Sequence, residues 1–512
     1  MIKFFVNKMK GKILLAFLLT LSIYSTTAEA KKRIAILPFE VLSEKSEHKQ
    51  FGIGTMDTLS VAMTSISDFV MIDRGRISKV IQEQSFQKSG FTDTTQSASL
   101  GKIRGAEIIV TGSIQSFDNE FRITANFIEV ETGKILKASK VTGNNIFQLQ
   151  DKMADQLLQL ENITLNETQR NEISKITNST NNAKAFDYYT TGRTYYYKLL
   201  DYGLSSKGIN ETKEDYLNNH KMAMENFDKA ISLDNKYFLA IASKSETQSL
   251  HYAFLASNGE GNKEEIYKYL SEAKKNAELA FSLSKNSGVI YRAFALHSFM
   301  SMNINKTIEY SKKAIEYNPN DEESYLWLSM SYYMEGYNFF EQNQLDNAIV
   351  SLNNCIKANP IFTNAYYKLG NIYEIKNDSE LAIIYYKKAL KIYPKNEEVK
   401  KSLISLYHKV AIDFYKKSNF EKVEEIYKSI IEINPNDSDA YNNLASKYLM
   451  DKNYKLAEEM YKKAIDSDPK RSIFYQNLGL LYDTIKNTKE AKIYYKKACD
   501  LGNSDACNLL NK

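Results

Sequence analysis

The residues of this chain that could take part in chemistry are few and scattered. Ser99-Leu100-Gly101-Lys102 has the end of a phosphate-binding loop, but Gln96 stands where that loop needs its first glycine and Ile103 where it needs Ser or Thr. No Gly-x-Ser-x-Gly nucleophile motif occurs. The histidines never occur in pairs at metal-ligand spacing: His48, His220, His251, His297 and His408. The sequence therefore predicts no catalytic, cofactor or metal site, and no enzyme.

Two of the three cysteines have the spacing of a disulfide. Leu501-Gly502-Asn503 breaks the helix that carries Cys499, and Ser504 can cap a short terminal helix that carries Cys507. Two antiparallel helices with so short a loop bring the Cα atoms within the roughly 4–7 Å that a disulfide needs. We predict a Cys499–Cys507 disulfide, and two reduced packing cysteines are the alternative. Cys355 is predicted to be a buried thiol.

The helices that carry these cysteines belong to a regular series that the prolines mark. Five of the six prolines are separated by 41, 34, 41 and 34 residues: Pro319, Pro360, Pro394, Pro435 and Pro469. Because proline cannot continue a helix, each one marks the end of a helix. A spacing of 34 is the period of a helix-turn-helix repeat, and 41 adds 7 residues, which is two helical turns. We place these additional residues, in the units starting at Glu322 and Glu397, between the first helix and the second.

Small and aromatic residues recur at fixed positions within these units. The unit at 363–396 has Tyr366, Leu369, Gly370 and Tyr373 on its first helix, and the second helix continues the pattern with Ala382, Tyr386, Ala389 and Pro394. The same residue types return at 441–469 and at 475–498. The segment resembles the tetratricopeptide repeat (TPR) family, whose units stack into an all-α solenoid. The resemblance implies about eight units within residues 185–512, with a C-terminal capping helix. Residues 498–507 resemble the related Sel1-like repeat.

Residues 31–160 have the pattern of a different domain. An apolar run at 33–37 that ends at Pro38 predicts a buried strand, and residues 107–117 and 120–130 predict a hairpin across Asp118-Asn119. Further strands are expected at 69–72 and 135–141. Helices are expected around 56–66 and 77–84. The prediction is an α+β domain with helices on a mixed, mostly antiparallel sheet, joined by a linker at 161–184 to the helical array.

Several short motifs in this domain occur in a family order. Ile34-Ala35-Ile36-Leu37-Pro38-Phe39, Met71-Ile72-Asp73-Arg74 and Val110-Thr111-Gly112-Ser113 are among them. Over about 110 residues the segment resembles the CsgG family of curli-production transport components, which work at the outer membrane and whose type member is an oligomeric secretion channel. The channel-forming members carry an anchoring cysteine and inserted membrane hairpins. This segment has no such cysteine and a single hairpin, so we expect only the globular fold and no intrinsic transmembrane pore.

The N-terminal residues predict export. Lys3, Lys8, Lys10 and Lys12 precede an apolar run at 13–23, and Ala28-Glu29-Ala30 supplies a small-x-small cleavage site. We expect residues 1–30 to be a cleaved signal peptide, with a retained membrane anchor as the alternative. No cysteine follows the apolar run, so no lipobox is present. The expected location is the periplasm, where a disulfide persists.

These features together favour a binding protein. A net charge of +5 over 512 residues gives no electrostatic case for nucleic acid. We expect a non-enzymatic scaffold or adaptor that binds a protein or peptide in a groove lined by first helices and associates with an envelope assembly. A component of an outer-membrane secretion complex is the alternative. The candidate groove residues, each equally interpretable as an ordinary solvated helix position, are Tyr367, Asn371, Asn442, Ser446 and Gln476.

Overall fold

The structure, a computed structural model, describes residues 32–43, 48, 51–64, 69–71, 106–118, 120–159, 167, 171, 175–176, 179–204, 212–259, 262–285, 287–319 and 321–510. The first of its two compact units ends at Phe362 and the second begins at Thr363. The predicted signal peptide, the predicted helix at 77–84 and most of the predicted linker at 161–184 lie outside the described residues.

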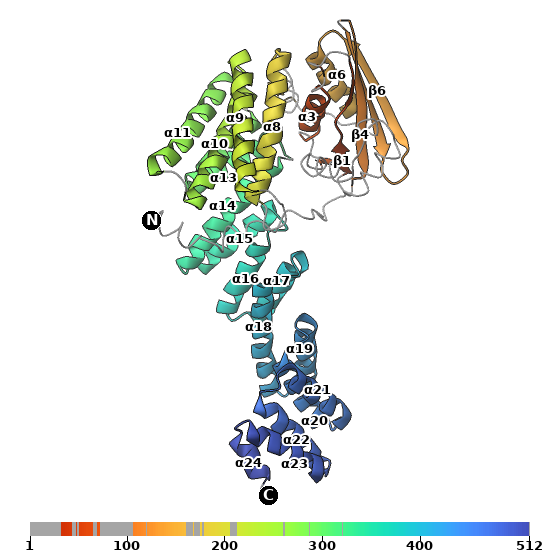
Figure 1. The fold of residues 1–512 in the computed structure, drawn as a ribbon, viewed down its shortest axis with the longest axis vertical. Helices are drawn as coiled ribbons and strands as arrows, with labels where there is room; N and C mark the ends of the chain where they lie inside the picture. Colours follow the sequence, from red (N-terminus) through yellow and green to blue (C-terminus); the bar gives the residue numbers. More distant parts are fainter. Residues whose placement is uncertain are drawn as a thin grey trace. The chain divides into compact units, whose positions relative to one another are not determined.

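A mixed sheet forms the N-terminal part of the first unit (Figure 1). Its strands are β1 (Lys32–Ile36), β2 (Glu40–Leu42), β3 (Phe69–Met71), β4 (Ile108–Phe117), β5 (Glu120–Glu129) and β6 (Ile135–Gly143). The strand order is β3-β1-β4-β5-β6, and β2 also pairs with β4. The long ladders β4–β5 and β5–β6 are antiparallel, and the short pairings of β1 and β2 are parallel. Asp118 has a positive φ of 50°, as the predicted two-residue turn between β4 and β5 requires.

Two helices pack on one face of this sheet. Alternate residues of β4 and β5, such as Val110 and Ile123, join one core with Met56 of α3 (Phe51–Thr64) and Leu149 of α6 (Ile146–Gln159). A buried polar link also joins the two helices. The amide of Gln150 donates to Thr55 Oγ1 over 2.9 Å, and Thr58 Oγ1 donates to Gln150 Oε1 over 3.3 Å. The α+β fold class is therefore confirmed for this part of the chain.

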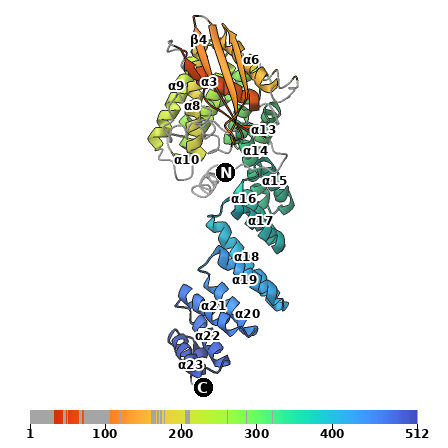
Figure 2. The same ribbon diagram turned by 90° about the vertical axis from the view of Figure 1, so that its right-hand side faces the viewer.

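The core of the sheet continues into the helical array. Phe186 of α8 (Ala183–Leu204) packs on Gly54 of α3 so closely that a Cβ at position 54 would lie 2.0 Å from Phe186 Cε1. One buried cluster includes Ile34 of β1, Phe186, and Ala293 of α12 (Gly288–Met300). Figure 2 shows the first helices of the array next to the sheet and α3. The α+β domain and the first helices of the array therefore share one hydrophobic core within the first unit.

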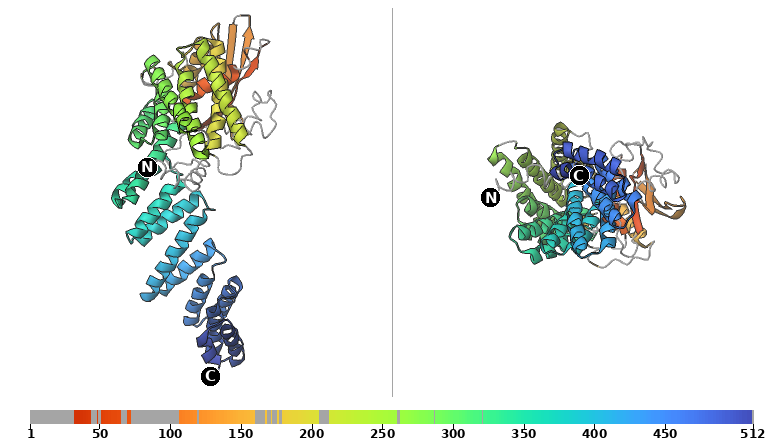
Figure 3. Two further views of the ribbon diagram at one scale, coloured as in Figure 1. Left: turned by 60° about the vertical axis from the view of Figure 1, so that its left-hand side comes forward. Right: turned by 90° about the horizontal axis from the view of Figure 1, so that it is seen from below.

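The remainder of the chain is helical and forms successive antiparallel pairs. In the first unit these are α8 with α9 (Lys213–Leu233), α10 (Phe238–Asn258) with α11 (Lys263–Leu283), α12 (Gly288–Met300) with α13 (Ile304–Tyr317), and α14 (Glu322–Glu341) with α15 (Leu345–Ala358). In the second unit they are α16 (Thr363–Ile375) with α17 (Ser379–Ile392), α18 (Glu397–Lys416) with α19 (Phe420–Ile433), α20 (Ser438–Met450) with α21 (Tyr454–Ser467), and α22 (Ser472–Thr484) with α23 (Thr488–Asp500). The short α24 (Ser504–Leu510) follows. The pairs of the second unit stack in sequence order (Figure 3), which confirms the all-α repeat fold.

The seven additional residues of the repeats that start at Glu322 and Glu397 lie in a place that differs from our prediction. We expected them between the two helices of the unit, but they lengthen the first helix itself. Helices α14 and α18 have 20 residues, whereas α16, α20 and α22 have 13. The second helices α15, α17, α19 and α21 all have 14. Because α18 contains neither Gly nor Pro, nothing in its sequence ends the helix early.

Within each pair, one small residue of the first helix lets the second helix approach. Gly370 and Gly479 both lie five residues before the end of their first helix. A Cβ at position 370 would lie 2.4 Å from the ring of Tyr386, and one at position 479 would lie 2.7 Å from the ring of Tyr495. Any larger residue would displace the aromatic ring. The predicted pairing of Gly or Ala with a second-helix tyrosine is the physical basis of the repeat.

The turn between the two helices of a unit is also repeated. Asn377, Ser418, Lys452 and Lys486 each adopt a left-handed conformation with φ between 58° and 62°. The next residue is in every case an Asp or Asn that caps the second helix by accepting a hydrogen bond from a backbone N–H, as in Asn453 with Leu456. Such caps satisfy backbone donors that the first turn leaves free. The turns thus fix where each second helix begins.

Candidate functional site: the first-helix face of the repeat array

The five predicted groove residues occupy two equivalent positions on the first helices of the second unit. Tyr367, Asn442 and Gln476 each lie eight residues before the end of their helix, and Asn371 and Ser446 lie four residues before it. We call these positions −8 and −4. Because i and i+4 share one face of a helix, all five belong to a single face, which we call the first-helix face.

Position −8 links each helix pair of the second unit to the next pair. Tyr367 Oη lies 3.2 Å from Ser402 Oγ of α18, and His408 Nε2, at position −8 of α18, lies 3.4 Å from Asp437 Oδ1 at the start of α20. The amide of Asn477 on α22 donates to Asn442 Oδ1 over 2.9 Å. The amide of Asn503, which precedes α24, donates to Gln476 Oε1 over 2.8 Å. The polar groups at this position therefore stabilise the stacking of neighbouring helix pairs.

Position −4 has two different uses. In α16 and α20 it links the first helix to the second helix of the same pair. Tyr386 Oη donates to Asn371 Oδ1 over 2.6 Å, and Ser446 Oγ lies 3.0 Å from Tyr461 Oη. In α18 and α22 the same position carries Ile412 and Leu480, both exposed. As ligand contacts, the five polar residues stay a prediction. In the structure their side chains hold the array together.

Exposed apolar side chains are the feature of this face that the sequence analysis missed. Ile375 and Met450 end α16 and α20, and Tyr415 precedes the last residue of α18. These three and Ile412 are between 46% and 53% exposed. Tyr415 Oη approaches Met450 Sδ to 3.9 Å, so the apolar surface continues from one first helix to the next. For Ile412 and Leu480 the signal was present in the sequence, as large apolar residues at the position where α16 and α20 have Asn371 and Ser446.

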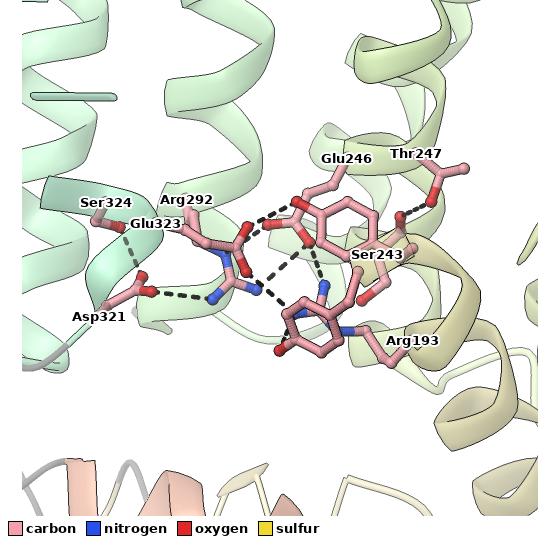
Figure 4. Close-up of polar contacts among 10 residues, drawn as sticks. Arg193, Ser243, Glu246, Thr247, Arg292, Asp321, Glu323 and Ser324 are labelled. Carbon is pink, nitrogen blue, oxygen red and sulfur yellow. Dashed lines mark hydrogen bonds and ion pairs between the residues drawn. The ribbon is translucent and has the colours of Figure 1, made fainter. Parts of the chain in front are cut away.

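A buried ionic cluster joins four first helices of the first unit, and it also escaped the sequence analysis (Figure 4). Arg193 of α8 lies 2.9 Å from Glu246 of α10 and 3.3 Å from Glu323 of α14, measured from guanidinium nitrogen to carboxylate oxygen. Arg292 of α12 lies 2.6 Å from Glu246 and 3.2 Å from Asp321. The Glu246 side chain is fully buried. These charges therefore replace the apolar contacts expected between stacked first helices.

Burial and the two arginines act in opposite directions on the carboxylates of this cluster. Burial raises the pKa of Glu246, and the guanidinium groups of Arg292 and Arg193 offset this only in part. Burial also acts to raise the pKa of Glu323, but the same two guanidinium groups and a 2.6 Å hydrogen bond from Tyr196 Oη lower it overall. Every charged group in Figure 4 has an ionic partner within the cluster. The cluster is thus suited to holding helices together.

Two histidines that are 31 residues apart in sequence are brought into contact by the fold. The rings of His220 on α9 and His251 on α10 stack with centroids 3.6 Å apart, and the neighbouring rings of Tyr216 and Phe254 stack at 3.9 Å. Burial, followed by the nearby His251, lowers the pKa of His220 to about 3. Parallel stacked rings do not point their nitrogens at a common atom. Among the described residues, no group of three or more His, Cys, Asp or Glu side chains is placed to hold a metal ion.

The cysteine pair lies where the sequence placed it. Cys499 is at the end of α23 and Cys507 is in α24, with Cα atoms 4.8 Å apart and the two sulfurs bonded. Gly502 has a φ of 90°, the left-handed conformation that ends α23. Ala506 of α24 is buried against the last pair. Cys355 is buried as a free thiol, and burial raises its pKa well above the usual range.

In the described part of the chain, no helix combines the length and the apolar character that crossing a lipid bilayer requires.

Comparisons with known proteins identify two families in the chain. Residues 20–126 match the family described as curli production assembly/transport component CsgG. Tetratricopeptide repeat families match residues 336–377, 363–396, 426–459 and 473–503. The human protein O-mannosyl-transferase TMTC1 is 28% identical over 126 residues, which are 24% of this chain and 14% of that protein. The chain thus spans about one seventh of that relative's length.

Two solved structures are also similar to parts of the chain. A MamA protein is 25% identical with a TM-score of 0.26, covering 34% of this chain and 91% of MamA. YrrB, described as a TPR protein with an unusual peptide-binding site, is 20% identical with a TM-score of 0.27, covering 40% of this chain and all of YrrB. The family matches, together with the fold, show that the chain carries a CsgG domain followed by an array of tetratricopeptide repeats.

Proposed function

We propose that the protein is an exported adaptor that binds another protein through the first-helix face of its second unit. The observation that carries this proposal is the set of exposed apolar side chains on that face: Ile375, Ile412, Tyr415, Met450 and Leu480. Isolated exposed apolar residues are ordinary, but Ile412 and Leu480 occupy the same position of alternate repeats, and Ile375 and Met450 do so as well. Tetratricopeptide repeats form a scaffold for protein–protein interaction, and a partner segment with apolar side chains would cover this surface.

Location in the periplasm is the second part of the proposal. It is supported by the basic and apolar pattern of residues 1–30, by the Ala28-Glu29-Ala30 site and by the CsgG match that follows. N-terminal sequencing of the protein recovered from the cell envelope tests it. A mature chain that begins at Lys31 is expected, and a chain that begins within residues 1–12 would show that the segment is retained as an anchor.

The binding surface is tested with charge substitutions on matched faces. Ile412→Glu with Leu480→Glu places two carboxylates on the first-helix face. Ile384→Glu with Ile493→Glu does the same on second helices α17 and α23, where both residues are also exposed. Pull-downs from envelope extracts with the wild-type chain define the bound protein. We expect the first double variant to lose it and the second to retain it, and equal retention by both would refute the proposed surface.

The CsgG match supports a second candidate, a subunit of an outer-membrane secretion complex. The two candidates differ in assembly state. A secretion subunit should form ring-shaped oligomers that depend on detergent, whereas an adaptor should purify without detergent as a smaller species. Size-exclusion chromatography with light scattering, with and without detergent, distinguishes them.

A further inference from the structure

Strand β6 forms one edge of the sheet that the described residues build. Strand β6 is the last in the order β3-β1-β4-β5-β6, and Figure 1 shows it at the side of the sheet. Among the described residues it pairs with β5 alone. An edge strand of nine residues presents a row of free backbone N–H and C=O groups, which a further strand can bind. Its side chains are accessible too, since residues 135–138 are all exposed.

The charge along this edge is of one sign. Lys134, Lys137 and Lys140 recur every three residues, and the stretch from 134 to 143 contains no Asp or Glu. On the neighbouring strand β5, residues 123–128 are uncharged. Arg122 of β5, which pairs with Thr142 of β6, adds a further positive charge. No ion pair involves any of the three lysines within the described part of the chain. The edge is therefore basic from Lys137 onward, whereas Glu129, which is bonded through its backbone to Lys134, and Glu131 lie near its start.

We propose that β6 binds an extended, acidic segment of a partner protein as an additional strand of the sheet. Successive side chains of a strand point to opposite faces, so Lys137 and Lys140, three residues apart, lie on different faces. Acidic residues spaced every three positions along the added strand would meet them on both faces. Opposite charges across neighbouring strands stabilise a ladder, and the exposed Ile135 and Leu136 add apolar contacts at its start.

The same charges disfavour a second copy of this chain as the occupant. Pairing of β6 with β6 would bring two sets of lysines together with no acidic residue between them. Like charges on adjacent strands destabilise pairing, and lysines on edge strands commonly prevent self-association. A heterologous acidic strand is the occupant that satisfies both the backbone and the charges.

The experiment uses the full-length protein and a defined probe. The probe is a fluorescein-labelled ten-residue peptide of valine and threonine with three glutamates spaced three residues apart, and binding is followed by fluorescence anisotropy. We expect binding that weakens at high salt, and at least about tenfold weaker binding by the Lys137→Glu, Lys140→Glu variant. Lys387→Glu with Lys388→Glu on α17, which changes the net charge equally, should leave the affinity unchanged.

A second peptide separates strand addition from attraction between charges. The probe methylated on every backbone nitrogen keeps its three glutamates but has no backbone N–H to donate from either edge, so it cannot complete a ladder. Loss of binding on methylation supports the proposal, whereas equal binding of both peptides would show a non-specific anion site and overturn it. No binding of either peptide would overturn it as well, leaving the lysines as a barrier to aggregation. Self-association of the wild-type chain that the Lys137→Glu, Lys140→Glu variant alters would assign the edge to a second copy and also overturn it.

Discussion

The guanidinium of Arg193 and the carboxylate of Glu323 lie 3.3 Å apart, although 130 residues separate them in the sequence. The pair connects α8 to α14, and Arg292 and Glu246 supply the links through α12 and α10. Units of a solenoid ordinarily contact only their neighbours, so that local unfolding can stay local. This cluster makes the stability of four first helices interdependent.

Removal of one carboxylate from the cluster should therefore be costly. Glu246→Ala leaves two buried guanidinium groups short of a partner, and we expect a loss of about 3–5 kcal/mol in the free energy of unfolding. Glu309→Ala breaks the exposed ion pair between Lys313 and Glu309 and should change the free energy of unfolding by no more than about 0.5 kcal/mol. Urea denaturation followed by circular dichroism measures both. Equal effects of the two substitutions would contradict the role of the cluster.

The link between α19 and α20 should be sensitive to acid. Glu424 accepts hydrogen bonds from Lys428 and Tyr448 and pairs with Lys447. Burial acts to raise the pKa of Glu424, but the bonds from Lys428, Lys447 and Tyr448 lower it overall to about 2. Because this value is below that of the unfolded chain, the stabilisation is fully present above about pH 4.5 and is lost as the pH falls towards 2.

The variant Glu424→Gln tests this directly. At neutral pH it should lose on the order of 2 kcal/mol of unfolding free energy, and its stability should change less than that of the wild type between about pH 4.5 and 2. Glu425→Gln, in the exposed pair with Lys422, is the matched control and should retain the wild-type pH dependence. Thermal unfolding across this pH range gives both quantities. Parallel curves for Glu424→Gln and the wild type would rule out the assignment.

The contact between α3 and α8 should not tolerate a methyl group. A Cβ at Gly54 would lie 2.0 Å from Phe186, so we expect Gly54→Ala to cost about 1–3 kcal/mol. Gly143→Ala, whose Cβ would meet its nearest atom at 3.3 Å, should cost less. Adding Phe186→Leu to Gly54→Ala should recover part of the loss, because the two changes act on one contact. Strictly additive effects in this double-mutant cycle would show that the residues do not touch.

Asn442 should act on stability and leave binding intact. Its Oδ1 accepts from Asn477 of the next first helix, so Asn442→Ala is expected to lower the unfolding free energy by about 1 kcal/mol. The same variant should retain the partner that Leu480→Glu loses, as measured by quantitative pull-down. A fully stable Asn442→Ala protein that no longer binds would instead assign this residue to the ligand.

The terminal disulfide should be present in the exported protein. Mass spectrometry without reduction is expected to find Cys499 and Cys507 joined. Two free thiols there would exclude the bridge. The closed loop spans a separation of only 8 residues, so Cys499→Ala with Cys507→Ala should cost at most about 2 kcal/mol. Hydrogen exchange should place the loss in α24 and the end of α23, with α20 unaffected.

The sequence was sufficient for the fold class because its signals are local and repeated. Prolines at fixed separations end the second helices, and Gly370 or Gly479 opposite a tyrosine defines how the helices pair. The hairpin of β4 and β5 was likewise predicted from alternation around Asp118-Asn119. The ionic cluster could not be predicted, because its members occur in the weaker repeats and each one alone resembles a solvated charge.

The groove residues illustrate a second limit of the sequence. Helical spacing alone places Tyr367 and Gln476 at equivalent positions of their first helices, as the structure has them. Spacing gives the face of a helix but not the distance to the next helix along the array. Ser402 and Asn503 lie close enough to use these polar groups, and that depends on how the units stack. Spacing also does not distinguish an exposed apolar residue such as Ile412 from a buried one.

The unequal first helices have a consequence for how such an array can change length. Helices α14 and α18 begin 75 residues apart, and so do α16 and α20, with the same alternation of 20 and 13 residues in each block. The elementary module of this region is thus a block of four helices. Duplication of one such block accounts for the pattern. Excision of residues 322–396 would join Asp321 to Glu397 and leave α18 three residues behind a proline, as α14 is now, so the array can shorten by a whole block and keep the spacing between proline and first helix.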